Sequence, residues 1–97
     1  MKREMEYFLA VAREESITAA AEKLYVGQPA VSKIISALEK ELGTKLFIRE
    51  HGGVILTPSG KIYEEYARRV EEIERDMKHE IEMFQKNRKR IIPTAMI

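Results

Sequence analysis

Four polar side chains in the first half of the sequence fall on one face of a predicted helix, and these are Gln28, Ser32, Lys33 and Ser36. The opposite face carries Val31, Ile35 and Leu38 at the spacing of a buried stripe. Short or flexible polar groups in this arrangement can reach base edges and phosphates in a DNA major groove. Pro29 and Ile34 share or border the face and offer apolar contact to thymine methyl groups. A solvated helix surface has a similar composition, so the face alone does not decide.

Apolar periodicity predicts three short helices around this face. Their buried stripes are Met5, Phe8, Leu9 and Ala12, then Ile17, Ala20, Ala21 and Leu24, and finally Val31, Ile35, Leu38 and Leu42. Ser16 is predicted to cap the second helix, and Pro29 suits the first turn of the third. Gly43 is predicted to end the third helix in a left-handed conformation.

The apolar period then changes from that of a helix to that of a strand. Two β-rich runs, at 46–49 and 54–57, flank a glycine-containing turn at 50–53 and predict a hairpin. Two helices joined by a tight turn and followed by a hairpin predict a winged helix-turn-helix. The expected fold class is therefore mainly α: three helices, a β-hairpin wing and a long following helix.

The long helix is expected at 58–88, with Thr57 as its cap and Pro58 in its first turn. Nothing breaks the helix from Lys61 to about Asn87, which is roughly 40 Å. One side of this helix is lined by Tyr66, Val70, Ile73, Met77, Ile81 and Phe84. We expect this stripe to pair with a second copy of the chain, with little supercoil because the spacing averages 3.6 residues. The alternative is that the helix folds back onto its own domain.

Composition places the chain among soluble globular proteins. It has 97 residues, of which 44% are apolar and 34% charged, and it has no cysteine for a disulfide or a thiolate metal site. No apolar run approaches the roughly 20 residues of a membrane span, and the N-terminus does not predict a signal peptide, so a cytoplasmic location is expected. The net charge is only +1, so a nucleic-acid binder of this composition must place its positive charge locally.

The sequence shows no combination of residues that is typical of a catalytic site. His51 lies in the predicted turn and His79 on a charged helix face, without metal-ligand spacing around either. Glutamates between 64 and 82 alternate with arginines and lysines, as on a solvated helix. We therefore expect no enzyme activity, no metal and no cofactor.

Six segments form a combination more specific than any single helix-turn-helix pattern. They are YFLAVA at 7–12, SITAAAEKL at 16–24, QPAVS at 28–32, LEKELG at 38–43, LFIR at 46–49 and LTPSG at 56–60. In order and spacing, from about residue 5 to 70, they closely resemble the N-terminal domain of LysR-type transcriptional regulators.

The resemblance implies a DNA-binding transcription factor domain at 1–57, with the helix at 28–42 in the major groove and the hairpin as its wing. It implies base or adjacent backbone contacts for Gln28, Pro29, Ser32 and Lys33, with Ser36 on the same face. Thr18 would meet a phosphate, and Arg49 matches a family arginine that meets the DNA backbone.

The segment at 58–88 resembles the family's linker helix, which pairs two protomers so that the dimer binds an interrupted palindrome. Residues 89–97 would be a tail or the start of an effector-binding domain, and a small-molecule effector would bind that domain rather than this segment.

Several positions depart from the family pattern. Gly27 replaces serine or alanine, Lys33 replaces arginine, and Ile34 replaces a residue that is often glutamine. Because lysine is a point charge, Lys33 favours a single contact over bidentate recognition of guanine. The turn at 50–53 lacks arginine and Ile55 takes a position that is commonly basic, so weak electrostatics are expected at the wing tip.

Two alternatives remain open from the sequence. The chain could be a protein-interaction module with a vestigial helix-turn-helix, which its near-neutral charge and the apolar residues Ile34, Ile48 and Ile55 favour. It could also be a DNA-binding domain of another winged-helix family, such as the molybdate-responsive regulators. The polar face at 28–36 and Arg49 count against the interaction module, which has no need of them.

Overall fold

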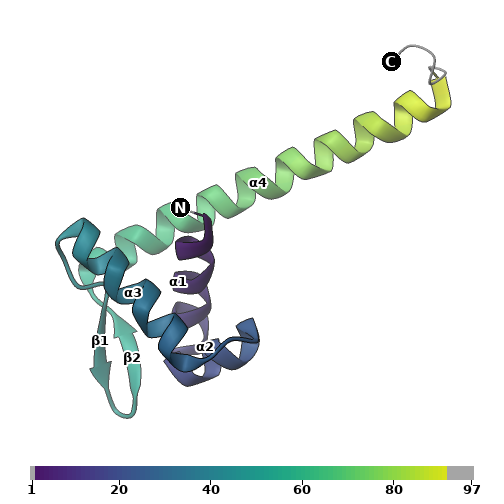
Figure 1. The fold of residues 1–97 in the computed structure, drawn as a ribbon. Coiled ribbons are helices and arrows are strands. Elements are labelled where there is room, and N and C mark those ends of the chain that lie inside the picture. The colour runs from purple at the N-terminus through teal and green to yellow at the C-terminus, as the bar shows by residue number, and fades with distance from the viewer. Residues whose placement is uncertain (1, 92–97) are drawn as a thin grey trace.

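A computed structural model describes residues 2–91 of the chain, and the side chains of residues 2–87. Three helices come first: α1 (Lys2–Glu14), α2 (Ile17–Leu24) and α3 (Gln28–Leu42). A hairpin of β1 (Phe47–Glu50) and β2 (Gly53–Leu56) follows, and α4 (Pro58–Ile91) then extends away from the other elements (Figure 1). This confirms the predicted winged helix-turn-helix with a long following helix.

The helix ends lie where short-range sequence signals predicted them. The Ser16 hydroxyl accepts a hydrogen bond from the backbone N–H of Ala19 at 3.1 Å and caps α2. Gly43 ends α3 with a φ of 71°, as predicted. Tyr25 ends α2 in the same left-handed region, with a φ of 59°, although it is not a glycine.

The hairpin is shifted by one residue toward its tip relative to the predicted strands at 46–49 and 54–57. His51 and Gly52 both have positive φ, 51° and 80°, which gives a two-residue loop rather than a four-residue turn. Glu50 therefore pairs with Gly53 at the strand ends. At the base of the hairpin, the Thr57 hydroxyl accepts a hydrogen bond from the Gly60 N–H, so Thr57 caps α4 instead of extending β2.

The wing is fixed to the rest of the domain along the outer edge of β2. The N–H of Val54 donates to the carbonyl of Glu15, between α1 and α2, at 3.1 Å. Gly60, in the first turn of α4, packs closely against Leu46, the residue before β1. A Cβ at position 60 would clash with the Leu46 carbonyl. These contacts set the direction in which the hairpin projects.

Phe8 lies at the centre of the hydrophobic core. Its ring centroid is 4.9 Å from that of Phe47 and 4.6 Å from that of Tyr63, so α1, the wing and α4 meet around it. The fully or nearly buried apolar residues are Tyr7, Phe8, Leu9, Val11, Ala20, Ala21, Val31, Ile35, Leu38, Leu46, Phe47, Val54 and Ala67. The Tyr63 hydroxyl lies among them without a hydrogen-bond partner, and burial raises the pKa of this phenol.

Two sequence predictions about α3 are wrong. Leu42 was expected in the buried stripe but is exposed, because α3 reaches the edge of the domain at its last turn. Ile34 was expected at the polar face but is half-buried and packs against the core. Helical periodicity places both residues beside the stripe, and only the neighbouring elements determine which of them is covered.

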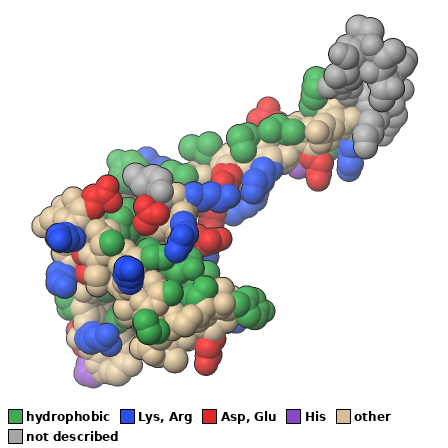
Figure 2. Space-filling model, viewed as in Figure 1, with side chains coloured by type: hydrophobic (Ala, Val, Ile, Leu, Met, Phe, Trp, Pro, Cys, Tyr) green, Lys and Arg blue, Asp and Glu red, His purple; other side chains and the backbone are tan. Residues whose placement is uncertain are grey.

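The apolar stripe of α4 is not covered by its own domain. Tyr63 and Ala67 pack into the core, but every described side chain from 75 to 87 is exposed. Figure 2 shows hydrophobic side chains in a row along the projecting part of this helix. The fold-back alternative is therefore wrong for residues 75–87.

The same helix continues to Ile91, three residues beyond the predicted end at 88, so residues 89–91 are helical rather than a tail. The remainder of the predicted tail, 92–97, lies outside the described residues. Within residues 2–91, none of the helices combines the length and the apolar character that crossing a membrane requires.

Candidate nucleic-acid interface

Helix α3 presents the predicted polar residues on its outer surface. Gln28, Pro29, Lys33 and Ser36 are exposed and Ser32 is half-buried. On the other side, Val31, Ile35 and Leu38 are buried against α1 and α2. The core thus holds α3 by one face and leaves the other free along the helix.

A groove of about 350 Å³ lies between α3 and the wing. Its walls include Ser32 and Ser36, from the predicted polar face of α3, and Arg49 of β1, which was predicted to meet the DNA backbone. The other lining residues are Ile17, Ile35, Glu39, Lys45, Phe47, Ile48 and Val54. The fold therefore brings two hydroxyl groups and a guanidinium group to one concave surface.

Thr18 is also exposed, in the first turn of α2, next to Ile17 at the wall of the groove. Ser16 caps this turn through the Ala19 N–H. Thr18 itself is not part of the groove lining, so the structure places it at the end of α2, beside the groove.

Glu39 connects the two walls of the groove. Its Oε2 accepts hydrogen bonds from the backbone N–H groups of Leu46 and Phe47, at 2.8 and 3.3 Å. Its Oε1 lies 3.7 Å from the Lys45 ammonium, which is largely exposed. Since Leu46 and Phe47 begin the wing, this carboxylate sets the position of the wing relative to α3.

Sequence reasoning missed Glu39 and Lys45 as parts of this surface. Lys45 had a usable signal, since it is a basic residue directly before the first β-rich run. Glu39 had none, because an acidic residue near the end of a helix reads as a solvated side chain until the chain folds back beside it.

Positive charge near the groove is sparse. Lys33 and Arg49 are exposed, while Lys45 forms an ion pair with Glu39. At the wing tip, His51 lies 3.5 Å from the carboxylate of Glu50. The surface thus carries a few individual positive charges rather than a broad basic patch.

Several arginines of α4 are paired with acidic residues of the same helix. Arg68, Arg69 and Arg75 each lie within 4 Å of a glutamate four residues earlier, namely Glu64, Glu65 and Glu71. These pairs reduce the local charge of the helix. The charge of these three arginines is therefore partly neutralised within α4 itself.

A second candidate surface is the apolar stripe of α4. Tyr66, Val70, Ile73, Met77, Ile81 and Phe84 are all exposed, as expected for a stripe awaiting a partner. Ile73 is the most accessible of them, with 67% of its surface exposed. Apolar exposure of this extent is typical of an interaction surface.

Groups suited to metal binding are not brought together in the described part of the chain. Among residues 2–91, no three His, Asp or Glu side chains lie close enough to hold a metal ion. His51 lies in the wing turn, and His79 lies on α4.

The sequence and the fold are similar to those of known bacterial regulators. The chain is 49% identical over 68 residues to the HTH-type transcriptional regulator ClcR of Pseudomonas putida, a match that covers 70% of the chain and 23% of ClcR. It is 48% identical over 66 residues to XapR of Escherichia coli, which covers 68% of the chain and 22% of XapR. The chain thus spans about a quarter of the length of the curated relatives it matches.

Solved structures of DNA-binding domains superimpose closely on the chain. The CbnR domain, crystallised as a DNA complex, matches with a TM-score of 0.80 at 35% identity, over 88% of this chain and 98% of that one. The BenM domain bound to the catB site 1 DNA matches with a TM-score of 0.76 at 35% identity, over 89% of this chain and 92% of that one.

A family profile described as "Bacterial regulatory helix-turn-helix protein, lysR family" matches residues 3–61. That range begins in α1 and ends in the first turn of α4, so it includes the polar face of α3, the groove and the wing. The chain belongs to the lysR family of bacterial regulatory helix-turn-helix proteins.

Proposed function

We propose that the chain is the sequence-specific DNA-binding part of a transcription regulator, with α3 in the major groove of double-stranded DNA. The observation that carries this proposal is the groove between α3 and the wing, whose walls bring Ser32, Ser36 and Arg49 together beside the exposed face of α3. The two similar domains solved as DNA complexes, CbnR and BenM, support it.

The side chains of α3 divide by chemistry and position. Gln28 offers an amide that can pair with an adenine edge, Pro29 an apolar contact to a thymine methyl, and Lys33 a donor to guanine or phosphate. Ser32 and Ser36 lie where α3 faces the groove, so their hydroxyls suit a base edge or a nearby phosphate. These five residues are proposed to carry recognition.

Backbone contacts are proposed for the residues that flank α3. Arg49 lies on the wing side of the groove and can pair with a phosphate oxygen. Thr18 lies in the first turn of α2, where a hydroxyl and free backbone N–H groups suit a phosphate. Such contacts fix the register of α3 without reading sequence.

The stripe of α4 is proposed to pair with a second copy of the chain. A protein exposing large apolar side chains from Tyr66 to Phe84 gains stability by covering them, and symmetry makes an identical stripe the available partner. The dimer would present two copies of α3 to an interrupted palindrome. The division into a DNA-reading unit at 1–57 and a pairing helix at 58–88 follows from this proposal.

The chain length and the family support two further parts of the proposal. The curated relatives are about four times longer than the region matched here, and in a protein of that length a small-molecule effector would bind outside the matched region. The chain's place of action would be the bacterial cytoplasm, where the chromosome lies.

The test is a fluorescence-anisotropy titration against a pool of randomised duplex DNA at low and moderate salt, with sequencing of the bound fraction. We expect enrichment of a two-fold symmetric site and an affinity that falls as salt rises. Absence of binding at both salt concentrations would contradict the proposal.

A second function is favoured by one observation on the wing. Ile48 and Ile55 are cross-strand partners, and both are exposed on the hairpin. An apolar pair in this position suits a protein partner as well as a DNA groove, so an interaction module with a vestigial helix-turn-helix is the second candidate. A folded, dimeric chain that binds no DNA in the titration would support it.

A further inference from the structure

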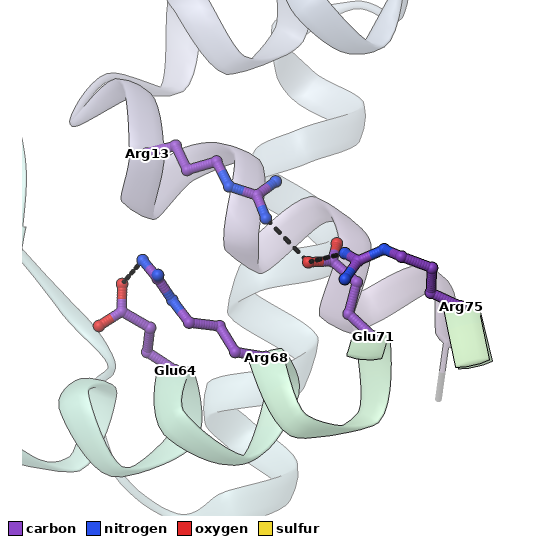
Figure 3. Close-up of polar contacts among 5 residues, drawn as sticks. All are labelled: Arg13, Glu64, Arg68, Glu71 and Arg75. Atoms are coloured by element: carbon purple, nitrogen blue, oxygen red, sulfur yellow. Dashed lines mark hydrogen bonds and ion pairs between the residues drawn. The ribbon is translucent and has the colours of Figure 1, made fainter. Parts of the chain in front are cut away.

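Two ion pairs join α1 to α4 beyond the edge of the hydrophobic core. The Arg13 guanidinium lies 3.0 Å from Oε1 of Glu71, as Figure 3 shows. The Lys2 ammonium lies 2.9 Å from Oε2 of Glu74, one turn further along the helix. Both pairs connect residues that are far apart in the sequence, so they bridge two elements rather than stabilise one.

These pairs lie at the point where α4 leaves the domain. Ala67 is the last fully buried residue of α4 among those whose side chains are described. Glu71 and Glu74 are half-buried, and every described side chain from 75 to 87 is exposed. The two pairs are thus the outermost polar contacts that the structure records between α4 and the rest of the domain.

The Arg13 pair is part of a small cluster. Oε1 of Glu71 also lies 3.9 Å from the Arg75 guanidinium, so one carboxylate faces two arginines from different helices (Figure 3). At the second bridge, the hydrogen bond with Glu74 raises the pKa of Lys2, and the same bond lowers the pKa of Glu74. The Lys2–Glu74 bridge is therefore fully charged at neutral pH.

A small change of angle at this point is amplified along the helix. From residue 75 to Ile91 the helix extends about 25 Å at 1.5 Å per residue, so a tilt of about 10° moves its far end by about 4 Å. One base pair advances about 3.4 Å along DNA, so such a displacement corresponds to about one base pair.

We propose that Arg13–Glu71 and Lys2–Glu74 set the angle of α4 and thereby select the spacing between the two half-sites of the operator. The inference rests on the proposed dimerisation through α4, because the angle translates into spacing only if two copies are joined by this helix. Neither pair lies on the exposed face of α3 or in the groove, so they would affect spacing without reading bases.

Exposed ion pairs contribute little to folding, so the effect is expected in spacing rather than in stability. A pair of this kind changes an equilibrium by about fivefold at most, and added salt weakens it. We therefore expect the discrimination between the best spacing and spacings one base pair longer or shorter to decrease as salt rises.

The test uses Glu71→Arg, which places three arginines together. It measures the affinity of this variant for three duplexes: one with the selected half-site spacing, one with the half-sites one base pair closer, and one with them one base pair further apart. We expect the discrimination to fall about threefold to fivefold, while affinity for a single half-site stays unchanged. The second substitution Arg13→Glu should restore the preference, because it recreates a bridge of opposite polarity between the same positions.

The matched control is Glu64→Arg. Glu64 pairs with Arg68 at 3.1 Å within α4, one heptad before Glu71, so this change has the same charge but breaks no bridge to α1 (Figure 3). An unchanged spacing preference in Glu71→Arg, or an equal change in the control, would overturn the proposal.

Sedimentation of the same samples separates this inference from the proposed function. A monomeric wild-type chain would overturn the dimer and this inference together. A dimer that binds its operator with the same spacing preference in every variant would overturn only the role of the two bridges.

Discussion

Oε2 of Glu39 lies 2.8 Å from the backbone nitrogen of Leu46, and this hydrogen bond connects α3 to the start of the wing. The neighbouring N–H of Phe47 donates to the same oxygen at 3.3 Å. One carboxylate therefore fixes the relative position of the two walls of the groove. In the proposed DNA complex, the wing and α3 would meet DNA together only while this arrangement is kept.

Replacing Glu39 is expected to weaken both folding and DNA binding. Glu39→Ala leaves the Leu46 and Phe47 N–H groups without their acceptor, which should lower the free energy of unfolding by about 1–3 kcal/mol. Urea titration measures this loss, and anisotropy measures DNA affinity below the unfolding transition. Glu41→Ala removes an exposed carboxylate from the same helix and should change neither; equal effects in both variants would contradict the role of Glu39.

Gln28 and Lys33 are expected to differ in their response to sequence and salt. Gln28→Ala should lower affinity for the selected operator by about 1–3 kcal/mol and leave non-specific binding unchanged, because an amide reads a base edge. Lys33→Ala should weaken binding to all sequences and reduce the slope of log affinity against log salt by about one. Lys40→Ala, at the exposed far end of α3, is the control, and a comparable slope change there would refute the assignment.

The apolar stripe of α4 is expected to be needed for pairing but not for folding. Val70→Glu with Ile73→Glu places two charges in its centre, and both side chains are exposed in the single chain. We expect a folded monomer in sedimentation and a large loss of affinity for a two-half-site duplex, because bivalent binding is lost. His79→Glu with Lys86→Glu changes the opposite face of the helix and should leave the dimer intact. A dimer that persists in the stripe variant would exclude this interface.

Gly60 is expected to tolerate no side chain. A Cβ at this position would clash with the Leu46 carbonyl, so Gly60→Ala should displace α4 or the wing and lower the melting temperature by several degrees. Gly27→Ser is the control, since a Cβ there meets only Pro29 Cδ at an ordinary 3.6 Å and the hydroxyl can cap α3. Thermal melts that rank the two variants in the reverse order would contradict this packing.

Tyr63 is expected to make stability depend on alkaline pH. Burial raises the pKa of its phenol in the folded chain above the value of about 10 in the unfolded chain, so its contribution is complete below pH 10 and is lost as pH rises further. Tyr63→Phe should remove this part of the alkaline loss and should not lower stability at pH 7, because the hydroxyl has no partner. Tyr25→Phe, at a fully exposed tyrosine, should keep the wild-type pH profile in denaturant titrations from pH 7 to 11.

Local signals were sufficient to predict much of the fold. The caps at Ser16 and Gly43 and the buried residues Val31, Ile35 and Leu38 of α3 depend on short-range signals, and the structure confirms them. The hairpin register depends on the backbone conformation of His51, whose positive φ is uncommon for a residue other than glycine. That conformation moved the strands by one residue.

Features that depend on residues distant in the sequence could not be predicted in this way. Glu39 is seven residues from Leu46, and no period or motif in the helix shows that its carboxylate accepts two wing N–H groups. The same holds for Arg13 and Glu71, which are 58 positions apart. The exposed face of α3 was predictable because it needs one helix, whereas the groove needs α3 and the wing together.

The exposed stripe of α4 has a consequence for how the protein responds to its own abundance. Because the core around Phe8 takes nothing from residues 75–87, we expect a single chain to fold without the proposed partner, so that pairing would be a separate equilibrium. At concentrations below the dimer dissociation constant, the amount of dimer rises with the square of the amount of chain. A twofold change in synthesis would then change operator occupancy about fourfold. If the proposed dimer is the DNA-binding form, the uncovered helix would convert a modest change in expression into a steeper change in operator occupancy.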